Sequence, residues 1–208
     1  NEEEINGKIL ELEKQFEAGQ DMSVIAGCYS CLDRCMSVMN ATKKHVDISV
    51  ENLYTWVFKS IAVGTGDISR YAMTNKALRL MKNHAVFFKK MIALNIENLH
   101  KIVLGINKKE YDDNDSKSMS KRMSKHAVGA LQAVLSQASC YAKETKHSSC
   151  LSFLRKLVNK FSSDLSGSSS ASASDTLFAV VGLSDISPCL MILHSNPEES
   201  EQFVLNIL

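Results

Sequence analysis

Long apolar segments are missing from this sequence. Across its 208 residues the apolar runs are short and broken by polar side chains, well under the roughly 18 residues that a membrane-spanning helix needs. The first residues also lack the apolar stretch of a secretory signal. The composition, 45% hydrophobic and 23% charged, is typical of a globular chain that buries a substantial core. We therefore expect a soluble chain of one large domain or two small ones.

Proline is almost absent, with two residues in the whole chain. Pro188 follows Ser187 and Pro197 follows Asn196, so each proline comes directly after a side chain that can cap a helix. Proline at the first helical position loses nothing, because its missing N–H has no partner there in any case. The two prolines therefore predict helix starts, not helix breaks.

Apolar residues recur instead at steps of three and four from Ile5 to the final Leu208, which is the spacing of amphipathic helices. The pattern predicts about nine or ten helices. Its most regular stripe contains several alanines that permit close helix approach, so we expect that helix at the centre of the packing. The stripe comprises Met119, Met123, Ala127, Ala130, Leu131, Val134, Ala138 and Tyr141.

Several helix ends can be predicted from local signals. Asp21 is placed to cap the second helix, and a segment that starts at Asp67 is expected to break near Asn83. A polar loop is expected from 107 to 116. Residues 176 to 183 are rich enough in β-branched side chains to form a strand, but their neighbours favour a short helix.

The helices divide into a main helical domain at 1–165, a flexible Ser/Gly/Ala linker or loop at 166–174, and further helices at 175–208 that pack on the main domain. The chain opens on Asn1 and not on Met. Its end is apolar and needs a partner to cover it. We therefore interpret the chain as part of a larger protein, with an exposed apolar end at Phe203, Val204, Ile207 and Leu208.

The fold class follows from this succession of helices. An all-α chain of antiparallel helix pairs with a period of roughly 40 residues resembles armadillo or HEAT repeats in its helix rhythm, although no repeated sequence consensus is present. The alternative is a closed helical bundle. An uncovered apolar stripe at the end favours the solenoid, because each repeat of a solenoid covers the next.

Six cysteines are present, and three of them imitate a metal motif. Cys28, Cys31 and Cys35 form C-x2-C-x3-C, with His45 as a possible fourth ligand. On one helix the first and last of these thiols are separated by about 10 Å of rise, whereas two thiolates on one zinc must lie within about 4 Å. We therefore assign the three to the apolar core and expect no metal and no cofactor.

Cys140, Cys150 and Cys189 have no motif spacing. Six cysteines without a secretion signal indicate reduced thiols. We therefore expect an intracellular protein, nuclear or cytoplasmic.

No catalytic motif is found. Gly64-Thr65-Gly66 before Asp67 is interpreted as a turn that ends a helix, because a dinucleotide fingerprint needs a preceding strand. The acidic residues from Asp112 to Asp115 lack the glycine and the twelfth-position glutamate of a calcium loop. No histidine has a partner at the spacing of a triad or a zincin helix. We expect no catalytic residue.

Charge is distributed unevenly along the chain. The net charge is +1, but residues 117–160 contain nine Lys and Arg against one acidic residue, and residues 161–208 contain none against six. The basic part is a candidate surface for nucleic acid or for an acidic protein. Its basic residues are Lys117, Lys121, Arg122, Lys125, Lys143, Lys146, Arg155, Lys156 and Lys160. Ser124, after Lys121 and Arg122, fits the pattern of a basophilic kinase site.

Three hypotheses follow. The first is a non-enzymatic helical scaffold that binds partner proteins within a larger assembly, with no membrane partner. The second is a nucleic-acid-binding helical module that uses the basic residues of 117–160, on duplex backbone more than on single strands, because few aromatic side chains lie in this segment. The third is an enzyme with a site assembled across helices, and it is the least favoured.

Overall fold

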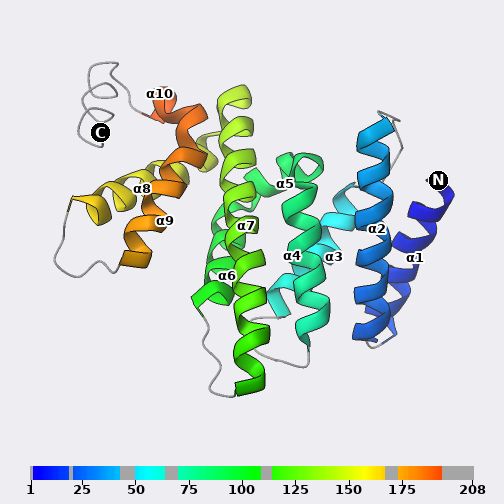
Figure 1. Cartoon of the computed structure of the whole chain (residues 1–208). Coiled ribbons are helices and arrows are strands. Elements are labelled where there is room, and N and C mark those ends of the chain that lie inside the picture. Colours follow the sequence, from blue (N-terminus) through cyan, green and yellow to red (C-terminus); the bar gives the residue numbers. More distant parts are fainter. Residues whose placement is uncertain are drawn as a thin grey trace.

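A computed structural model of the chain describes residues 2–18, 21–42, 50–63, 70–108, 114–166 and 173–193. Within these ranges every regular element is a helix (Figure 1), which confirms the all-α prediction and its nine or ten helices. The elements are α1 (Glu2–Glu17), α2 (Met22–Thr42), α3 (Val50–Val63), α4 (Tyr71–Asn83), η2 (Ala85–Phe88), α5 (Lys89–Leu94), α6 (Ile96–Lys108), α7 (Asn114–Thr145), α8 (Ser148–Leu165), α9 (Ala173–Ile186), η3 (Ser187–Cys189) and α10 (Leu190–Leu193).

Asp21 caps α2, as the sequence predicts. Its Oδ1 atom accepts hydrogen bonds from the backbone N–H of Ser23 at 3.0 Å and of Val24 at 3.3 Å, and from the Ser23 hydroxyl at 2.7 Å. The bond from the Ser23 hydroxyl is the main cause that lowers the pKa of the Asp21 carboxyl, because it stabilises the ionised form. Local sequence therefore determines where α2 begins.

The expected break near Asn83 is confirmed. α4 ends at Asn83, His84 has non-helical backbone angles (φ −127°, ψ 26°), and the chain continues through η2 into α5. The side chains at the break reach another helix: the Asn83 amide and the His84 ring lie 2.9 and 3.0 Å from a carboxylate oxygen of Asp33 on α2. The break in the helix thus coincides with a polar contact between α4 and α2.

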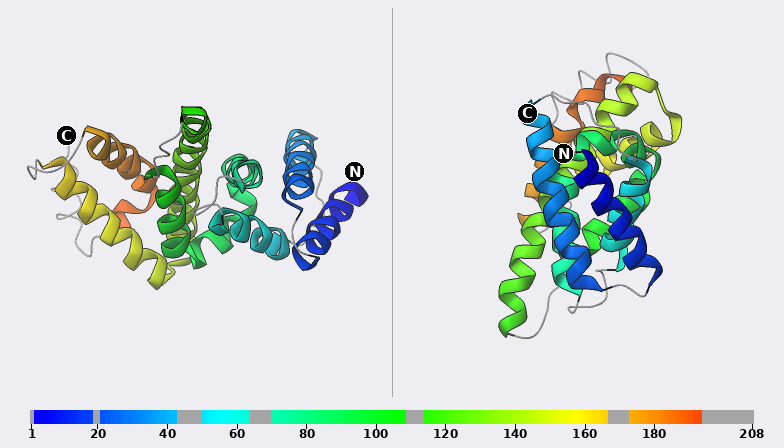
Figure 2. Two further views of the ribbon diagram at one scale, coloured as in Figure 1. Left: turned by 90° about the horizontal axis from the view of Figure 1, so that it is seen from below. Right: turned by 90° about the vertical axis from the view of Figure 1, so that its right-hand side faces the viewer.

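The helices form two layers. α2, α4, α7 and α9 lie side by side in one layer, and α1, α3, α6 and α8 lie side by side in the other (Figure 2). Each helix contacts its neighbours in its own layer and its partner in the opposite layer, so that four pairs follow one another from α1 to α9. α7 contacts helices on both sides and in both layers, which confirms its predicted central position.

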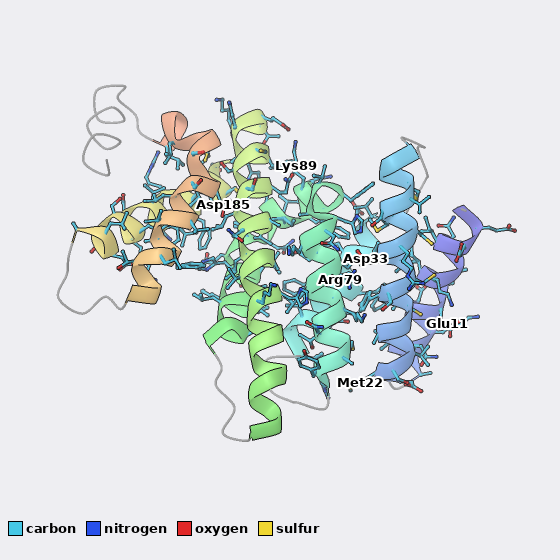
Figure 3. All side chains as sticks on the ribbon, viewed as in Figure 1. Glu11, Met22, Asp33, Arg79, Lys89 and Asp185 are labelled. Atoms are coloured by element: carbon cyan, nitrogen blue, oxygen red, sulfur yellow. The ribbon has the colours of Figure 1, made fainter. Side chains whose placement is uncertain are left out.

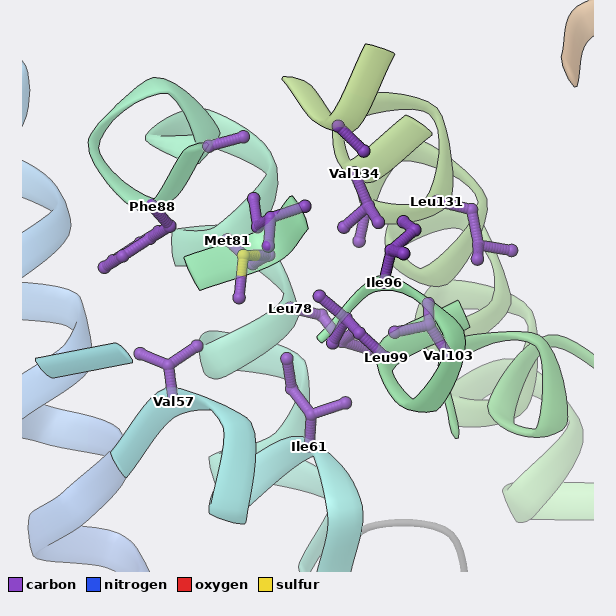
Figure 4. Packing of buried hydrophobic residues seen from close by; sticks show 14 of the residues in the cluster. Val57, Ile61, Leu78, Met81, Phe88, Ile96, Leu99, Val103, Leu131 and Val134 are labelled. Atoms are coloured by element: carbon purple, nitrogen blue, oxygen red, sulfur yellow. The ribbon is translucent and has the colours of Figure 1, made fainter. Parts of the chain in front are cut away.

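The core lies between the two layers. Alanines of α7 at 127, 130 and 138 are fully buried and let its neighbours approach closely. Side chains from α3, α4, η2, α6 and α7 meet at the middle of the molecule (Figure 4). The labelled residues there are Val57, Ile61, Leu78, Met81, Phe88, Ile96, Leu99, Val103, Leu131 and Val134.

The C-terminal part of the described chain is also helical. Residues 176 to 183 lie inside α9, so the helix, and not the strand, is confirmed. α9 contacts α7 and α8, and Pro188 lies in the first turn of η3, as predicted. The predicted cap is wrong, because η3 begins at Ser187, its N-cap residue is Ile186, and no side chain caps it. None of the helices in the described ranges has the length and apolar character required to cross a membrane.

One predicted connection is wrong. The loop expected from 107 to 116 is shorter, because α6 continues to Lys108 and α7 already begins at Asn114. Polar composition alone does not distinguish a loop from the exposed end of a helix.

Other predictions fall outside the described residues, and so does most of the proposed linker. They concern His45, Gly64 to Asp67, Asp112, Asp113, Asn196, Pro197, Phe203, Val204, Ile207 and Leu208.

Candidate anion-binding surface

The structure does not gather all the basic residues of 117–160 into one cluster. Lys125 and Lys143 are exposed on the same side of α7, but 18 residues of helix separate them by about 27 Å. Lys146 follows the end of α7 and is exposed. Lys117, Lys121, Arg122 and Ser124 lie on the first half of α7, and their side chains are outside the described part of the chain.

The basic residues of α8 belong to the opposite layer. Arg155 donates a hydrogen bond from Nε to the backbone carbonyl of Leu193 at 2.7 Å, which links α8 to α10. Lys156 lies close enough to Glu97 of α6 to help lower the pKa of that carboxyl, after the larger effect of Lys101. Lys160 is exposed. The α8 cations therefore face different surroundings from Lys125.

A second group of cations lies beside Lys125 in its own layer. Exposed or half-buried basic side chains of α2, α4 and α7 come together there, and we call this group the cationic surface. Lys82 of α4 reaches over α7, since a Cβ placed on Gly129 would lie 2.8 Å from its Cδ atom. The cationic surface comprises Arg34, Lys76, Arg79, Lys82 and Lys125.

His126 reports the electrostatic potential of this surface. The ring is half-buried on α7, and burial is the main cause that lowers its pKa. Four neighbouring cations lower the pKa further, because a positive environment disfavours the protonated ring. They are Lys82, Arg79, Lys125 and Lys76. The protonated, cationic form of the His126 ring is therefore disfavoured on this surface.

A buried carboxylate anchors the cationic surface. Asp33 of α2 forms an ion pair with Arg79, Nε to Oδ2 at 3.1 Å (Figure 3). Its Oδ1 atom lies 2.9 Å from the Asn83 amide nitrogen, which donates a hydrogen bond, and 3.0 Å from His84 Nε2. A buried charge needs such partners to offset its desolvation. Arg79 of α4 is therefore held against α2 by one buried anion.

The two layers differ in charge. α2, α4, α7 and α9 contain nine Lys and Arg against five Asp and Glu, whereas α1, α3, α6 and α8 contain eight against nine. α4 contains three cations and no acidic residue. The positive potential is thus concentrated on the layer that presents the cationic surface.

One group of side chains has the donor types of a metal site. The thiol of Cys31 donates to the Glu4 carboxylate at 3.5 Å, and the ligand atoms of Glu4, Cys31 and Cys35 lie within 4.8 Å of one another. Thiolate and carboxylate are ligands that zinc accepts. Cys28 is buried in the core, as predicted, so the structure does not bring all three cysteines of the motif to one point. The core assignment is wrong for Cys31, which is half-buried beside Glu4, and Cys35 is half-buried against the edge of the core.

A family model described as DNA-PKcs, N-terminal, matches residues 3–196. The chain belongs to this family. The match extends from α1 to beyond α10, so one family accounts for all the described helices. No curated protein and no solved structure shows a significant match.

Membership of the DNA-PKcs N-terminal family indicates a helical region of a larger protein, in agreement with the interpretation of the sequence. The family match assigns no residue to a ligand. The cationic surface of this DNA-PKcs N-terminal chain is therefore defined by the geometry of its own side chains.

Sequence analysis missed Arg34, Lys76, Arg79 and Lys82. The helix α4 lies outside the basic segment of 117–160, and the distribution of charge along the chain does not show which helices lie side by side. A local signal was present, because Lys76, Arg79 and Lys82 follow at steps of three with no acidic residue in the helix. Arg34 has no such signal in the sequence, because it belongs to the cationic surface only through the packing of α2 against α4.

Proposed function

We propose that this member of the DNA-PKcs N-terminal family is a non-enzymatic scaffold that binds acidic partner proteins through the cationic surface. Basic side chains of α2, α4 and α7 lie together on one layer, and Asp33 holds one of them, Arg79, in place. This observation carries the proposal. Acidic partners gain association rate and specificity from such a positive field. The scaffold acts within a larger protein, in the nucleus or the cytoplasm.

The stacking of helix pairs supports an armadillo/HEAT-like solenoid. Contacts in the described chain run mainly between neighbouring pairs, and two layers of helices follow one another from α1 to α9 (Figure 2). In a solenoid each repeat contacts only its neighbours and the layers form extended binding surfaces. A surface that crosses α2, α4 and α7 spans three successive pairs, which suits an extended partner.

A nucleic-acid-binding module is the second candidate. Lys125 and Lys143 lie on the same side of α7, about 27 Å apart, as contacts to a long polyanion require. Salt separates the two candidates, because counterion release makes binding to duplex DNA or RNA fall steeply between low salt and 200 mM. Absence of duplex binding at low salt, or binding that 200 mM salt leaves unchanged, contradicts this candidate.

Charge reversal of the cationic surface tests the scaffold. In the triple variant Arg34→Glu, Lys76→Glu, Lys125→Glu, we expect partner capture from cell extract to fall by at least about tenfold, because each reversed charge repels an acidic partner. Capture is measured by quantitative mass spectrometry, and circular dichroism verifies unchanged helix content.

The matched control carries the same charge change in the opposite layer, Lys101→Glu, Lys156→Glu, Lys160→Glu. It should capture the wild-type set of proteins. If the control loses its partners while the surface variant retains them, the binding face lies on α6 and α8 and the proposal is wrong.

A further inference from the structure

A cavity of about 100 Å³ opens between α2 and α4 on the cationic surface. It is lined by Tyr29, Ser30, Asp33, Arg34, Lys76 and Arg79. We propose that this cavity binds the phosphate monoester of a phosphorylated serine or threonine in a partner protein. The inference rests on the proposed scaffold function and names the chemistry that one part of the surface recognises.

The size of the cavity limits its occupant. A cavity needs only about 10–15 Å³ to hold a single water molecule. The volume of about 100 Å³ is several times larger and admits a tetrahedral phosphate group. Sites for whole small molecules are typically about 300–1,000 Å³. The cavity therefore suits the head of a modified side chain and is too small for a nucleotide.

The charge of the lining selects a dianion. Arg34, Lys76 and Arg79 contribute three positive charges, and Asp33 contributes one negative charge. A phosphate monoester carries about −1.5 to −2 at pH 7 and matches the excess of two positive charges. A carboxylate side chain or a phosphodiester of nucleic acid carries only one negative charge. The monoester therefore gains the most from this cavity.

Arg79 is held in place before any ligand binds. Its Nε atom forms an ion pair with Asp33 Oδ2 at 3.1 Å, and the opposite oxygen of Asp33 is held by Asn83 and His84. Because this contact uses Nε, both Nη groups remain for an anion, in the fork geometry that pairs with phosphate oxygens. The side chain of Arg79 is 50% exposed, so a partner can reach it.

The wall of the cavity is equally fixed. Tyr29 is 1% exposed, and its hydroxyl shares a hydrogen bond of 2.7 Å with the Ser60 hydroxyl of α3. Ser60 also accepts a hydrogen bond at its carbonyl from the Thr74 hydroxyl of α4 at 3.2 Å. The two walls of the cavity, α2 and α4, are thus joined beneath it, and binding needs little reorganisation.

Small esters test the cavity directly. Methyl phosphate represents the monoester and dimethyl phosphate the diester, and each is titrated into the full 15N-labelled chain while the amide signals of Tyr29 to Arg34 and the Arg79 Nε signal are followed. We expect methyl phosphate to bind at least about tenfold more tightly, since charge-assisted contacts to the second negative charge are strong. Equal affinity for the two esters, or tighter binding of a 12-base-pair DNA duplex through these signals, would falsify the proposal.

Variants locate the binding. Lys76→Gln should weaken methyl phosphate binding by about tenfold, because it removes one charge-assisted contact. Lys101→Gln, an exposed lysine of α6 in the opposite layer, serves as the matched control and should leave the affinity unchanged. Unchanged affinity in Lys76→Gln, with folding verified by circular dichroism, places the anion elsewhere and overturns the assignment.

Phosphatase treatment distinguishes a phosphorylated partner from free phosphate. Captured partners are treated with a protein phosphatase and offered again to the wild-type chain. The amount of partner that binds should fall by at least about tenfold. If methyl phosphate binds but dephosphorylated partners are recaptured fully, the partner's phosphate is not what the cavity recognises, and the proposal is wrong. That result leaves the scaffold standing, because the scaffold fails only if charge reversal of the cationic surface leaves capture intact.

Discussion

Asp33 determines where the guanidinium of Arg79 on α4 lies. Its carboxylate is mostly buried and takes partners from Arg79, Asn83 and His84. Removing one partner of such a buried group costs more than the contact is worth, because the remaining charge stays desolvated. One acidic side chain thus fixes both the end of α4 and the position of a guanidinium on the cationic surface.

A second carboxylate is half-buried and less well satisfied. Burial raises the pKa of Asp185 on α9 to about 6, and its Oδ2 atom has no hydrogen-bond partner among the described atoms. A raised carboxyl pKa means that the folded state holds the proton more tightly than the unfolded state. The ionised carboxylate therefore costs stability above about pH 6, and this cost disappears as the pH falls below the unfolded value of 3.8.

Asp185→Asn should therefore stabilise the chain at neutral pH. We expect the free energy of unfolding to rise by about 1 kcal/mol at pH 7.5, a value discounted for partial solvent exposure. The gain should vanish near pH 4. Urea denaturation at both pH values measures it, with Asp164→Asn on α8 as the control. A gain of equal size at both pH values contradicts the assigned cause.

At the scale of the element, local signals predicted helix starts and breaks, and packing decided the rest. Asp21 and the break at Asn83 were predictable because the capping side chain and the change of periodicity are local. The cationic surface was not predictable, because the distribution of charge along the chain does not show which helices share a layer. Arg34 and Lys76 are 42 positions apart in sequence and line one cavity only because α2 packs against α4.

Two helical glycines provide a matched test of this packing. A Cβ on Gly182 of α9 would lie 2.5 Å from the buried ring of Phe161, which itself packs edge-on against Phe178. A Cβ on Gly129 of α7 would meet only the flexible chain of Lys82. The first contact cannot relax without moving the core, whereas the second can.

Gly182→Ala should lower the free energy of unfolding by about 1–3 kcal/mol through overpacking. Gly129→Ala should leave it unchanged or raise it by up to about 1 kcal/mol, because alanine is the better helix former. Thermal and urea unfolding measure both variants. Equal effects at the two positions would show that the contact between α9 and α8 is not as tight as described.

At the scale of the molecule, the two layers differ in charge. The α1, α3, α6 and α8 layer is nearly balanced in charge, and the layer with α2, α4 and α7 carries the positive excess. The family match covers both layers and assigns the binding function to neither. The physical case for a binding face therefore depends on this asymmetry, which only the three-dimensional arrangement exposes.

Hydrogen–deuterium exchange of the chain with and without a captured partner tests the central claim most directly. Partner contact slows exchange at exposed helix faces and at the ends that fray. The proposal predicts slower exchange in 22–42, 71–83 and the first half of α7, with α1, α3, α6 and α8 unchanged. Protection confined to α1, α3, α6 and α8 would contradict it.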